Sequence, residues 1–249
     1  MSAPTPPFPG AIGASHLRVY DSVAPDGLRG GTPHVHLACT EAYWVVAGEG
    51  RVQTLGGDGF RETPLSAGRF VWFTPGTIHR LVNEDGRLEI LVLMQNAGLP
   101  EAGDMVITFE DALLADVERH RDAHALPPGE TTTAGGGEAA RRRRDRGVEG
   151  FLALREAVAA RGPEALAAFH ARAASIVGAD LPRWRKIWED GPLAAAARTG
   201  DQLDALARGD VSHLGASSVH VHGAPGEERR MGCCGTLGVY VGDGADRRV

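Results

Sequence analysis

The fold is decided by residues 32–48, which read TPHVHLACTEAYWVVAG. Alternate residues of a β-strand share a face, so His34 and His36 point the same way. A short turn then lets Glu41 open the next strand, antiparallel and beside the first. Two imidazoles and one carboxylate therefore converge, and Tyr43 shares the face of Glu41.

A second informative stretch, residues 68–83, reads GRFVWFTPGTIHRLVN. It predicts a strand that ends in a Pro-Gly turn, followed by a strand that projects His79, Leu81 and Asn83 onto one face. If that face lines the interior of the same small barrel, His79 adds a third imidazole to the first three groups.

Short strand-like runs separated by glycine-containing turns extend over residues 16–96. This spacing is typical of a β-sandwich or β-barrel. The predicted strands are His16–Tyr20, Pro33–Leu37, Glu41–Val46, Arg51–Leu55, Arg69–Phe73, Ile78–Asn83 and Leu88–Met94.

The two stretches resemble the signature motifs of the cupin superfamily, a histidine pair with a glutamate and a glycine, then a turn with a histidine and an asparagine. The resemblance covers about residues 16–96 and implies a small antiparallel barrel of cupin or jelly-roll type. It also implies that His34, His36, Glu41 and His79 bind a divalent metal. A weaker similarity, to the cupin-type phosphoglucose isomerases, comes from Tyr43 and from the ending His-x-x-Val-Asn.

Three imidazoles and one carboxylate suit one divalent transition metal, and these residue types do not distinguish Fe, Mn, Ni, Co, Zn and Cu. An octahedral ion would keep two positions for a substrate, a water or dioxygen. Glu41 and Tyr43 are candidates for acid/base catalysis. The candidates for substrate contacts are Asn83, Gln53, Arg51 and Arg80.

The leading hypothesis is a metal-dependent enzyme of isomerase, epimerase or lyase type, acting on a small polar or carbohydrate-like metabolite. Two alternatives stay open at this stage. One is an Fe(II)-dependent dioxygenase, in which the open metal positions hold substrate and O₂. The other is a non-catalytic binding or regulatory module.

Composition narrows the class of protein further. The 249 residues are 43% hydrophobic, enough for a substantial core, and 26 basic against 32 acidic residues exclude a basic nucleic-acid surface. No apolar run is long enough for a membrane span, and the N-terminus lacks the features of a signal peptide. Three cysteines do not form a disulfide framework, so we expect a cytoplasmic protein without nucleic-acid or membrane partners.

The chain changes character along its length, and the predicted fold class is α+β. Residues 1–15 predict a proline-rich arm, 16–100 the barrel, 101–209 a helical region with a flexible linker near 127–139, and 210–249 a terminal β-hairpin that packs back on the barrel. The arm and the returning strands would suit a homodimer.

Within the helical region, patterns of apolar residues predict helices over 110–125, 138–161, 163–177 and 193–206, the last interrupted near Gly200. Trp184 and Trp188 are expected to anchor this region onto the barrel or onto a second subunit. The arginines at 141–144 are interpreted as a solvated helix face.

The terminal hairpin is predicted to pair Ser217–His222 with Thr236–Val241. A second, softer metal site is the less favoured reading of its side chains, which are His213, His220, His222, Cys233 and Cys234.

Overall fold

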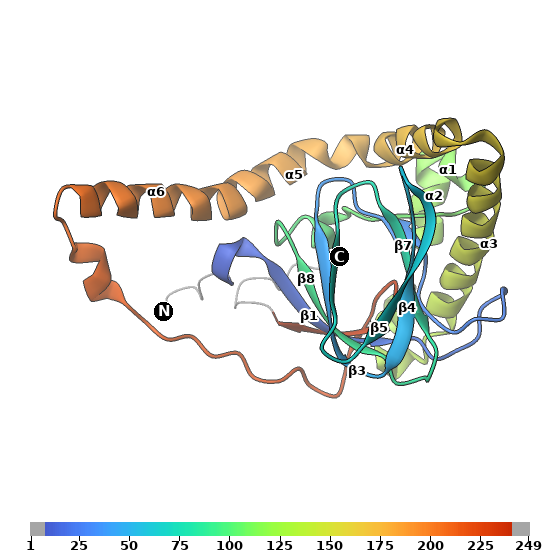
Figure 1. Ribbon diagram of the computed structural model, residues 1–249, viewed down its shortest axis with the longest axis horizontal. Coiled ribbons are helices and arrows are strands. Elements are labelled where there is room, and N and C mark those ends of the chain that lie inside the picture. Colours follow the sequence, from blue (N-terminus) through green and yellow to red (C-terminus); the bar gives the residue numbers. More distant parts are fainter. Residues whose placement is uncertain (1–7, 241–249) are drawn as a thin grey trace.

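The computed structural model describes residues 8–240 and centres on an antiparallel β-barrel built from two sheets (Figure 1). The six-stranded sheet has the order β10-β11-β1-β8-β3-β6, and the five-stranded sheet the order β5-β4-β7-β2-β9. The strands are β1 (Gly13–Val19), β2 (His34–Val35), β3 (Glu41–Ala47), β4 (Glu49–Gly56), β5 (Gly59–Ser66), β6 (Phe70–Phe73), β7 (Ile78–Asn83), β8 (Glu89–Met94), β9 (Val106–Ile107), β10 (Arg230–Met231) and β11 (Gly235–Tyr240). The predicted α+β fold with a cupin-type barrel is confirmed.

Two strands of the barrel, β5 and β9, are absent from the sequence prediction. β5 is an edge strand whose side chains are mostly exposed, so it carries charged residues and Pro64 in place of an apolar alternation. β9 is only two residues long and leaves no periodic signal.

Helices cover one side and one end of the barrel. They are α1 (Asp111–Leu114), α2 (Val117–His124), α3 (Glu138–Arg161), α4 (Pro163–Val177), α5 (Leu181–Trp188) and α6 (Ala194–Ala207). Figure 1 shows α3 standing beside β4 and β5, while α4 and α5 cross one end of the barrel. The remaining helical turns are η1 (Pro9–Ala11), η2 (Pro100–Ala102), η3 (Pro128–Glu130), η4 (Thr133–Gly135), η5 (Gly178–Asp180), the π-helical η6 (Glu189–Leu193) and η7 (Ser212–Ala216).

Two helix predictions need correction. The single helix expected over 110–125 is two helices, because Asp116 leaves the helical conformation and its side chain caps the start of α2 by accepting from Arg119 N. The helix expected to break at Gly200 instead continues from Ala194 to Ala207.

The arginines at 141–144 are not a uniformly solvated face. Arg143 and Arg144 are buried, and Arg144 donates to the carbonyl oxygens of Ser22, Val23 and Gly30 on the loop between β1 and β2. A long arginine that satisfies several carbonyls at once can be buried at an interface between elements. Arg144 therefore fixes α3 against the barrel.

The segment expected as a flexible linker, residues 127–139, is ordered by backbone hydrogen bonds. Thr133 N donates to Arg229 O, and Met231 N donates to Thr131 O. These contacts join η4 to β10, so the segment is part of the packed structure.

The terminal hairpin differs from its prediction in its first strand. β10 takes the place expected for Ser217–His222, and β11 pairs along β1 from Ala14–Tyr240 to Val19–Gly235. Ser217–His222 is instead exposed and has no regular secondary structure, and the His222 ring lies 6.0 Å from the ring of Tyr240 on β11. Residues 1–7 of the predicted arm and Val241–Val249 lie outside the described residues.

No helix within residues 8–240 combines the length and the apolar character needed to cross a membrane.

The two tryptophans of the helical region, Trp184 and Trp188, differ in their burial. Trp184 is buried in the main core and its Nε1 donates to Ala102 O at 3.0 Å, as an anchor would, whereas Trp188 stays half-buried.

We expect Arg144→Ala to lower the free energy of unfolding by about 3 kcal/mol, because three carbonyl oxygens lose a donor inside the structure. Arg142→Ala on the same helix is the matched control, since Arg142 is exposed and pairs only with Glu138. Its expected effect is within about 0.5 kcal/mol. Urea unfolding followed by circular dichroism compares the two, and equal effects would contradict the role given to Arg144.

Candidate metal centre

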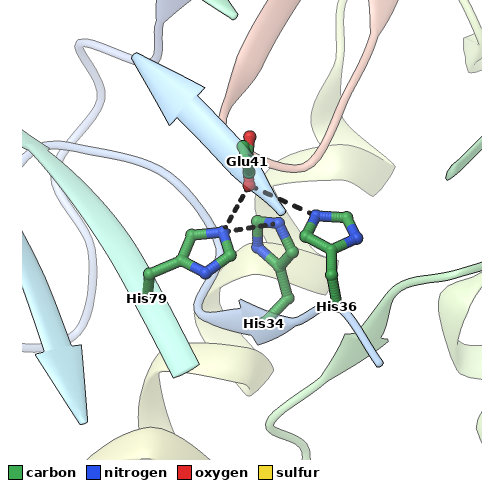
Figure 2. Close-up of side chains that lie close together, drawn as sticks. All are labelled: His34, His36, Glu41 and His79. Atoms are coloured by element: carbon green, nitrogen blue, oxygen red, sulfur yellow. Dashed lines mark hydrogen bonds and ion pairs between the residues drawn. The ribbon is translucent and has the colours of Figure 1, made fainter. Parts of the chain in front are cut away.

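Three histidines and one glutamate meet inside the barrel, near one of its ends (Figure 2). His34 lies on β2, His36 directly after it, Glu41 at the start of β3 and His79 on β7. His34 and His79 are direct cross-strand partners, which places their side chains on the same face of the sheet. The convergence predicted from the sequence is therefore present in the structure.

The four donor atoms lie within 4.8 Å of one another, and the residues are at most 7% exposed. His79 Nε2 is 3.1 Å from His34 Nε2. Glu41 Oε2 is 3.0 Å from His79 Nε2 and 3.3 Å from His36 Nε2. Ligands on opposite sides of one ion, each bonded at about 2 Å, are separated by about 4 Å. The spacing therefore matches a single coordination sphere.

Backbone carbonyls fix the orientation of all three imidazole rings. The Nδ1 atoms of His34, His36 and His79 face the carbonyl oxygens of Thr32, Asp104 and Thr77 respectively. A carbonyl oxygen can only accept, so each Nδ1 carries the hydrogen. Each Nε2 then presents a lone pair toward the centre of the cluster, in the arrangement typical of histidine ligands.

The cluster thus gathers atoms that accept and do not donate. Two Nε2 lone pairs face each other at 3.1 Å, and Glu41 Oε2 makes no well-directed hydrogen bond although it is buried. Buried acceptors without donors are costly, and a cation at their centre removes that cost. The residues present therefore fit a divalent metal ion.

Burial and charge together shift the pKa values of the clustered side chains in opposite directions. Burial and the neighbouring imidazoles of His79 and His36 hold the pKa of His34 well below its ordinary value. Burial would raise the pKa of Glu41, but the imidazoles of His79 and His36 hold that pKa well below its ordinary value. The carboxylate of Glu41 raises the pKa of His36 against the effect of burial. His34 and Glu41 are therefore kept in the forms that bind a metal.

Asp104 supports this centre and has no signal in the sequence. Its carbonyl oxygen accepts from His36 Nδ1, and its carboxylate accepts from the backbone N–H groups of Leu37, at 2.7 Å, and Ala38. The residue is fully buried, and 68 positions separate it from His36. It holds both the ring and the loop that leads from His36 to Glu41.

Tyr43 lies on the same face of β3 as Glu41, as predicted, and is fully buried. Its hydroxyl makes no hydrogen bond within the described residues. Burial, with the Glu41 carboxylate nearby, raises the pKa of this phenol well above its ordinary value. Phe73 is not singled out from the sequence. Its ring centroid lies 4.2 Å from that of His79, in a tilted arrangement, and 5.2 Å from that of Tyr43, edge to face.

Three of the expected substrate contacts lie on the wrong side of the sheet. Thr54 is the cross-strand partner of His79, so both side chains lie on the inner face of the sheet. Gln53 and Arg80 pair with each other one position along, so their side chains lie on the outer face. Arg80 is buried there and binds Asp26, while Gln53 and Arg51 both donate to Glu62 at 2.8 Å. The structure thus places Arg51, Gln53 and Arg80 away from the face of His79, and their contact with a substrate stays a prediction.

Asn83 shares the face of His79, as predicted, but lies four residues further along β7, about 13 Å away in an extended strand. Its side chain donates to Val19 O and accepts from Leu88 N, both at 3.1 Å. Asn83 therefore joins neighbouring strands at the far end of the barrel, and the structure does not bring it to the metal centre.

Helices α4 and α5 cover the end of the barrel nearest the cluster. His170 on α4 bonds Gly76 O at 2.8 Å, in the turn that leads to His79. Trp184 on α5 donates to Ala102 O, two residues before Asp104. We call α4 and α5 the helical cap. Phe169 and Ile176 of this cap share one hydrophobic cluster with the barrel interior.

The residues considered for a second metal site do not assemble one. Within residues 8–240, the metal-compatible group described above is the one that the structure brings together. Cys233 and Cys234 are buried in the barrel, whereas His220 and His222 lie on the exposed segment before β10.

Comparison with known families agrees with this architecture. Residues 20–94 match the family model of the cupin domain, and this part of the chain belongs to the cupin superfamily. A search of the curated proteins finds no matching sequence.

Several solved structures are similar to a part of this chain. KdgF from Halomonas sp. is 25% identical over 27% of this chain and 57% of its own, with a TM-score of 0.24. The TDP-fucose-3,4-ketoisomerase WlaRA from Campylobacter jejuni is 13% identical over 33% of this chain and 58% of its own, with a TM-score of 0.28. A cupin protein from Bacteroides fragilis is 20% identical over 35% of this chain and 65% of its own, with a TM-score of 0.26. Each match spans less than two thirds of the neighbour.

We expect Asp104→Ala to weaken binding of a divalent metal by about 10- to 100-fold, because His36 loses the loop geometry that orients it. Glu101→Ala is the matched control, an exposed acid in the preceding turn that accepts only from Gly98 N. Competition with a chelator measures both affinities. Unchanged affinity in a folded Asp104→Ala protein would contradict this role.

Proposed function

We propose that the chain is a metal-dependent cupin enzyme that catalyses proton transfer on a small polar or carbohydrate-like metabolite, in the manner of an isomerase, epimerase or lyase. One divalent transition ion would be held by His34, His36, Glu41 and His79. The observation that carries the proposal is the convergence of three imidazole lone pairs and a carboxylate oxygen that has no hydrogen-bond donor.

The ion would supply Lewis acidity for a substrate with adjacent hydroxyl and carbonyl oxygens. Tyr43 supports proton transfer as the accompanying chemistry. Its buried hydroxyl lies near the Glu41 carboxylate without a well-directed hydrogen bond, and its raised pKa keeps the proton on Oη until a substrate oxygen takes it. The proton that leaves the neighbouring substrate carbon would pass to Glu41, the second acid/base candidate. An oxygenase needs no such residue, because its substrate and O₂ both react at the ion.

Burial limits the size of the substrate. All four metal-binding candidates and Tyr43 are nearly inaccessible, and Phe73 packs against both Tyr43 and His79. We therefore propose a substrate of a few carbon atoms, which reaches the centre when the helical cap moves. Closure of the cap would then exclude water from the reacting groups.

We expect protein purified without chelator and without oxygen to contain about one transition metal per chain, measured by mass spectrometry. His79→Ala should lose the metal, because one of four ligands is missing. His16→Ala should retain it, since His16 lies on β1 outside the cluster and pairs with Glu89. At metal concentrations about 100 times Kd, binding should add about 2.7 kcal/mol to the stability of wild-type protein.

Two outcomes would contradict the metal site. One is a wild-type chain that stays empty after incubation with each of Fe, Mn, Ni, Co, Zn and Cu. The other is equal metal content in the His79→Ala and wild-type proteins.

We expect Tyr43→Phe to retain the metal and to lose at least about 100-fold in turnover, because the phenol is the proton donor. The measurement is NMR of small hydroxy-carbonyl compounds in D₂O, in which proton transfer incorporates deuterium next to the carbonyl group. The reaction should proceed fully under argon.

The same assay separates the alternatives. Turnover that requires dioxygen would replace this proposal with a dioxygenase. Metal-dependent binding of the compounds without any exchange would leave a binding module. Full activity in Tyr43→Phe would remove the tyrosine from the chemistry.

A further inference from the structure

His36 is held differently from the other three metal-binding candidates. His34, Glu41 and His79 lie within strands β2, β3 and β7, so the hydrogen bonds of the barrel strands fix their backbones. His36 follows the last residue of β2 and belongs to no strand. Its position therefore depends on the turns that contact it.

Two turns hold His36, one at its backbone and one at its ring. In the turn between β6 and β7, Gly76 N donates to the carbonyl oxygen of His36 at 2.9 Å. In the turn between η2 and β9, the carbonyl oxygen of Asp104 accepts from His36 Nδ1. The first turn thus sets the backbone of His36, and the second sets the direction of its ring.

Gly76 connects His36 to helix α4. Its φ of +87° lies in the left-handed region, which a glycine adopts without strain. Its N–H reaches His36, while its carbonyl oxygen faces α4 and accepts from His170 Nε2 at 2.8 Å. A carbonyl oxygen can only accept, so Nε2 of His170 carries the hydrogen. A single residue therefore links the cap to the backbone of a metal-binding residue.

The second turn is connected to helix α5 in a similar way. Trp184 is 4% exposed, and its Nε1 donates to the carbonyl oxygen of Ala102 at 3.0 Å. Ala102 N and Asp104 N both donate to Leu99 O, so the acceptor of Trp184 and the support of the His36 ring belong to one turn. Both helices of the cap, which cross one end of the barrel in Figure 1, thus reach the same metal-binding residue.

Apolar packing holds both donors in place on the barrel. Phe169 and Ala173 on α4 are buried, and Ile187 on α5 packs against the same hydrophobic core. Motion of the cap away from the barrel would therefore separate His170 and Trp184 from their carbonyl acceptors. The three metal-binding residues that lie in strands would keep their own backbone hydrogen bonds.

We infer that His170 and Trp184 are positioning residues for His36, and that the helical cap sets how firmly this one metal-binding residue is held. Closure of the cap and binding of the metal then favour each other, because each restrains His36. The inference rests on the metal site of the proposed function. It gives the helical region, which lies outside the family match at residues 20–94, a role in that site.

Variants that remove one donor and keep an apolar or aromatic side chain test the inference. His170→Leu and Trp184→Phe should each weaken cobalt binding by about five- to tenfold, measured by competition with a chelator, because His36 loses one support. His170→Gln should bind within about twofold of the wild type, since its amide nitrogen can donate to Gly76 O. Ser175→Ala, on the exposed side of α4, is the matched control and should bind cobalt like the wild type.

Proton NMR of the cobalt-loaded chain identifies the residue that is affected. Cobalt(II) is paramagnetic, so the Nδ1–H protons of the three imidazoles should give three signals far from the rest of the spectrum. In His170→Leu, one of the three should exchange with water at least about tenfold faster than in the wild type. Trp184→Phe should act on the same signal. Magnetisation transfer from Asp104 assigns that signal to His36, because the Asp104 carbonyl accepts its proton.

Several results would overturn the inference in a chain that binds cobalt. They are unchanged affinity in both variants, equal acceleration of all three signals, and acceleration of a signal other than that of His36. A His170→Gln protein as weak as His170→Leu would remove the hydrogen bond of His170 from the account. Circular dichroism checks the fold, and either variant decides the matter if the other does not fold. A wild-type chain that binds no divalent metal contradicts the proposed function itself, so the two failures are distinguishable.

Discussion

The site depends on one constraint, the hydrogen bonds that bind the Nδ1 atoms of three histidines to backbone carbonyls. The acceptors belong to Thr32, Asp104 and Thr77, which lie on three different segments of the chain. Thr32 and Thr77 lie only two residues before the rings that they bind, so those two contacts are local. The Asp104 carbonyl lies 68 residues from His36, so the fold itself sets the direction of that Nε2 lone pair. The free energy of folding thus maintains a cluster of acceptors that repel one another without a cation.

The helical region takes part in the same constraint. Trp184 and His170 bond the loops that carry Asp104 and His79, and Arg144 fixes α3 against the loop between β1 and β2. The barrel loops alone would have exposed carbonyls and mobile ends. Packing of α3, α4 and α5 over them replaces water with fixed donors, which keeps the cluster dry and its geometry defined.

Period-two alternation predicted that His34, His36 and Glu41 converge, because strand faces are fixed by local geometry. The resemblance to the cupin motifs added His79 and the metal. Alternation also placed Tyr43 beside Glu41. Alternation alone gives neither register nor distance. Gln53 and Arg80 therefore point outward from the sheet, while Asn83 shares the correct face at the wrong end of β7.

Other features depend on contacts between segments distant in the sequence, which no local pattern records. Asp104 supports His36 from 68 residues away. Arg143 and Arg144 look like surface charges in the sequence. In the structure Arg143 donates to the carbonyl oxygens of His124 and Gly232, and Arg144 to those of the loop between β1 and β2. The strand that completes the sheet beside β1 comes from the end of the described chain, and β10 pairs with it in place of Ser217–His222.

Helix α5 of the helical cap and the projecting helix α6 lie on one continuous helical run. α5 passes through the π-helical η6 into α6 without a break in the helical backbone from Leu181 to Ala207. Trp184 on this run packs at the barrel end, and Leu206 lies at the end that projects away from it. Because this run has no break, a motion of α5 that opens the barrel end also displaces α6, so access of substrate to Tyr43 involves the whole run.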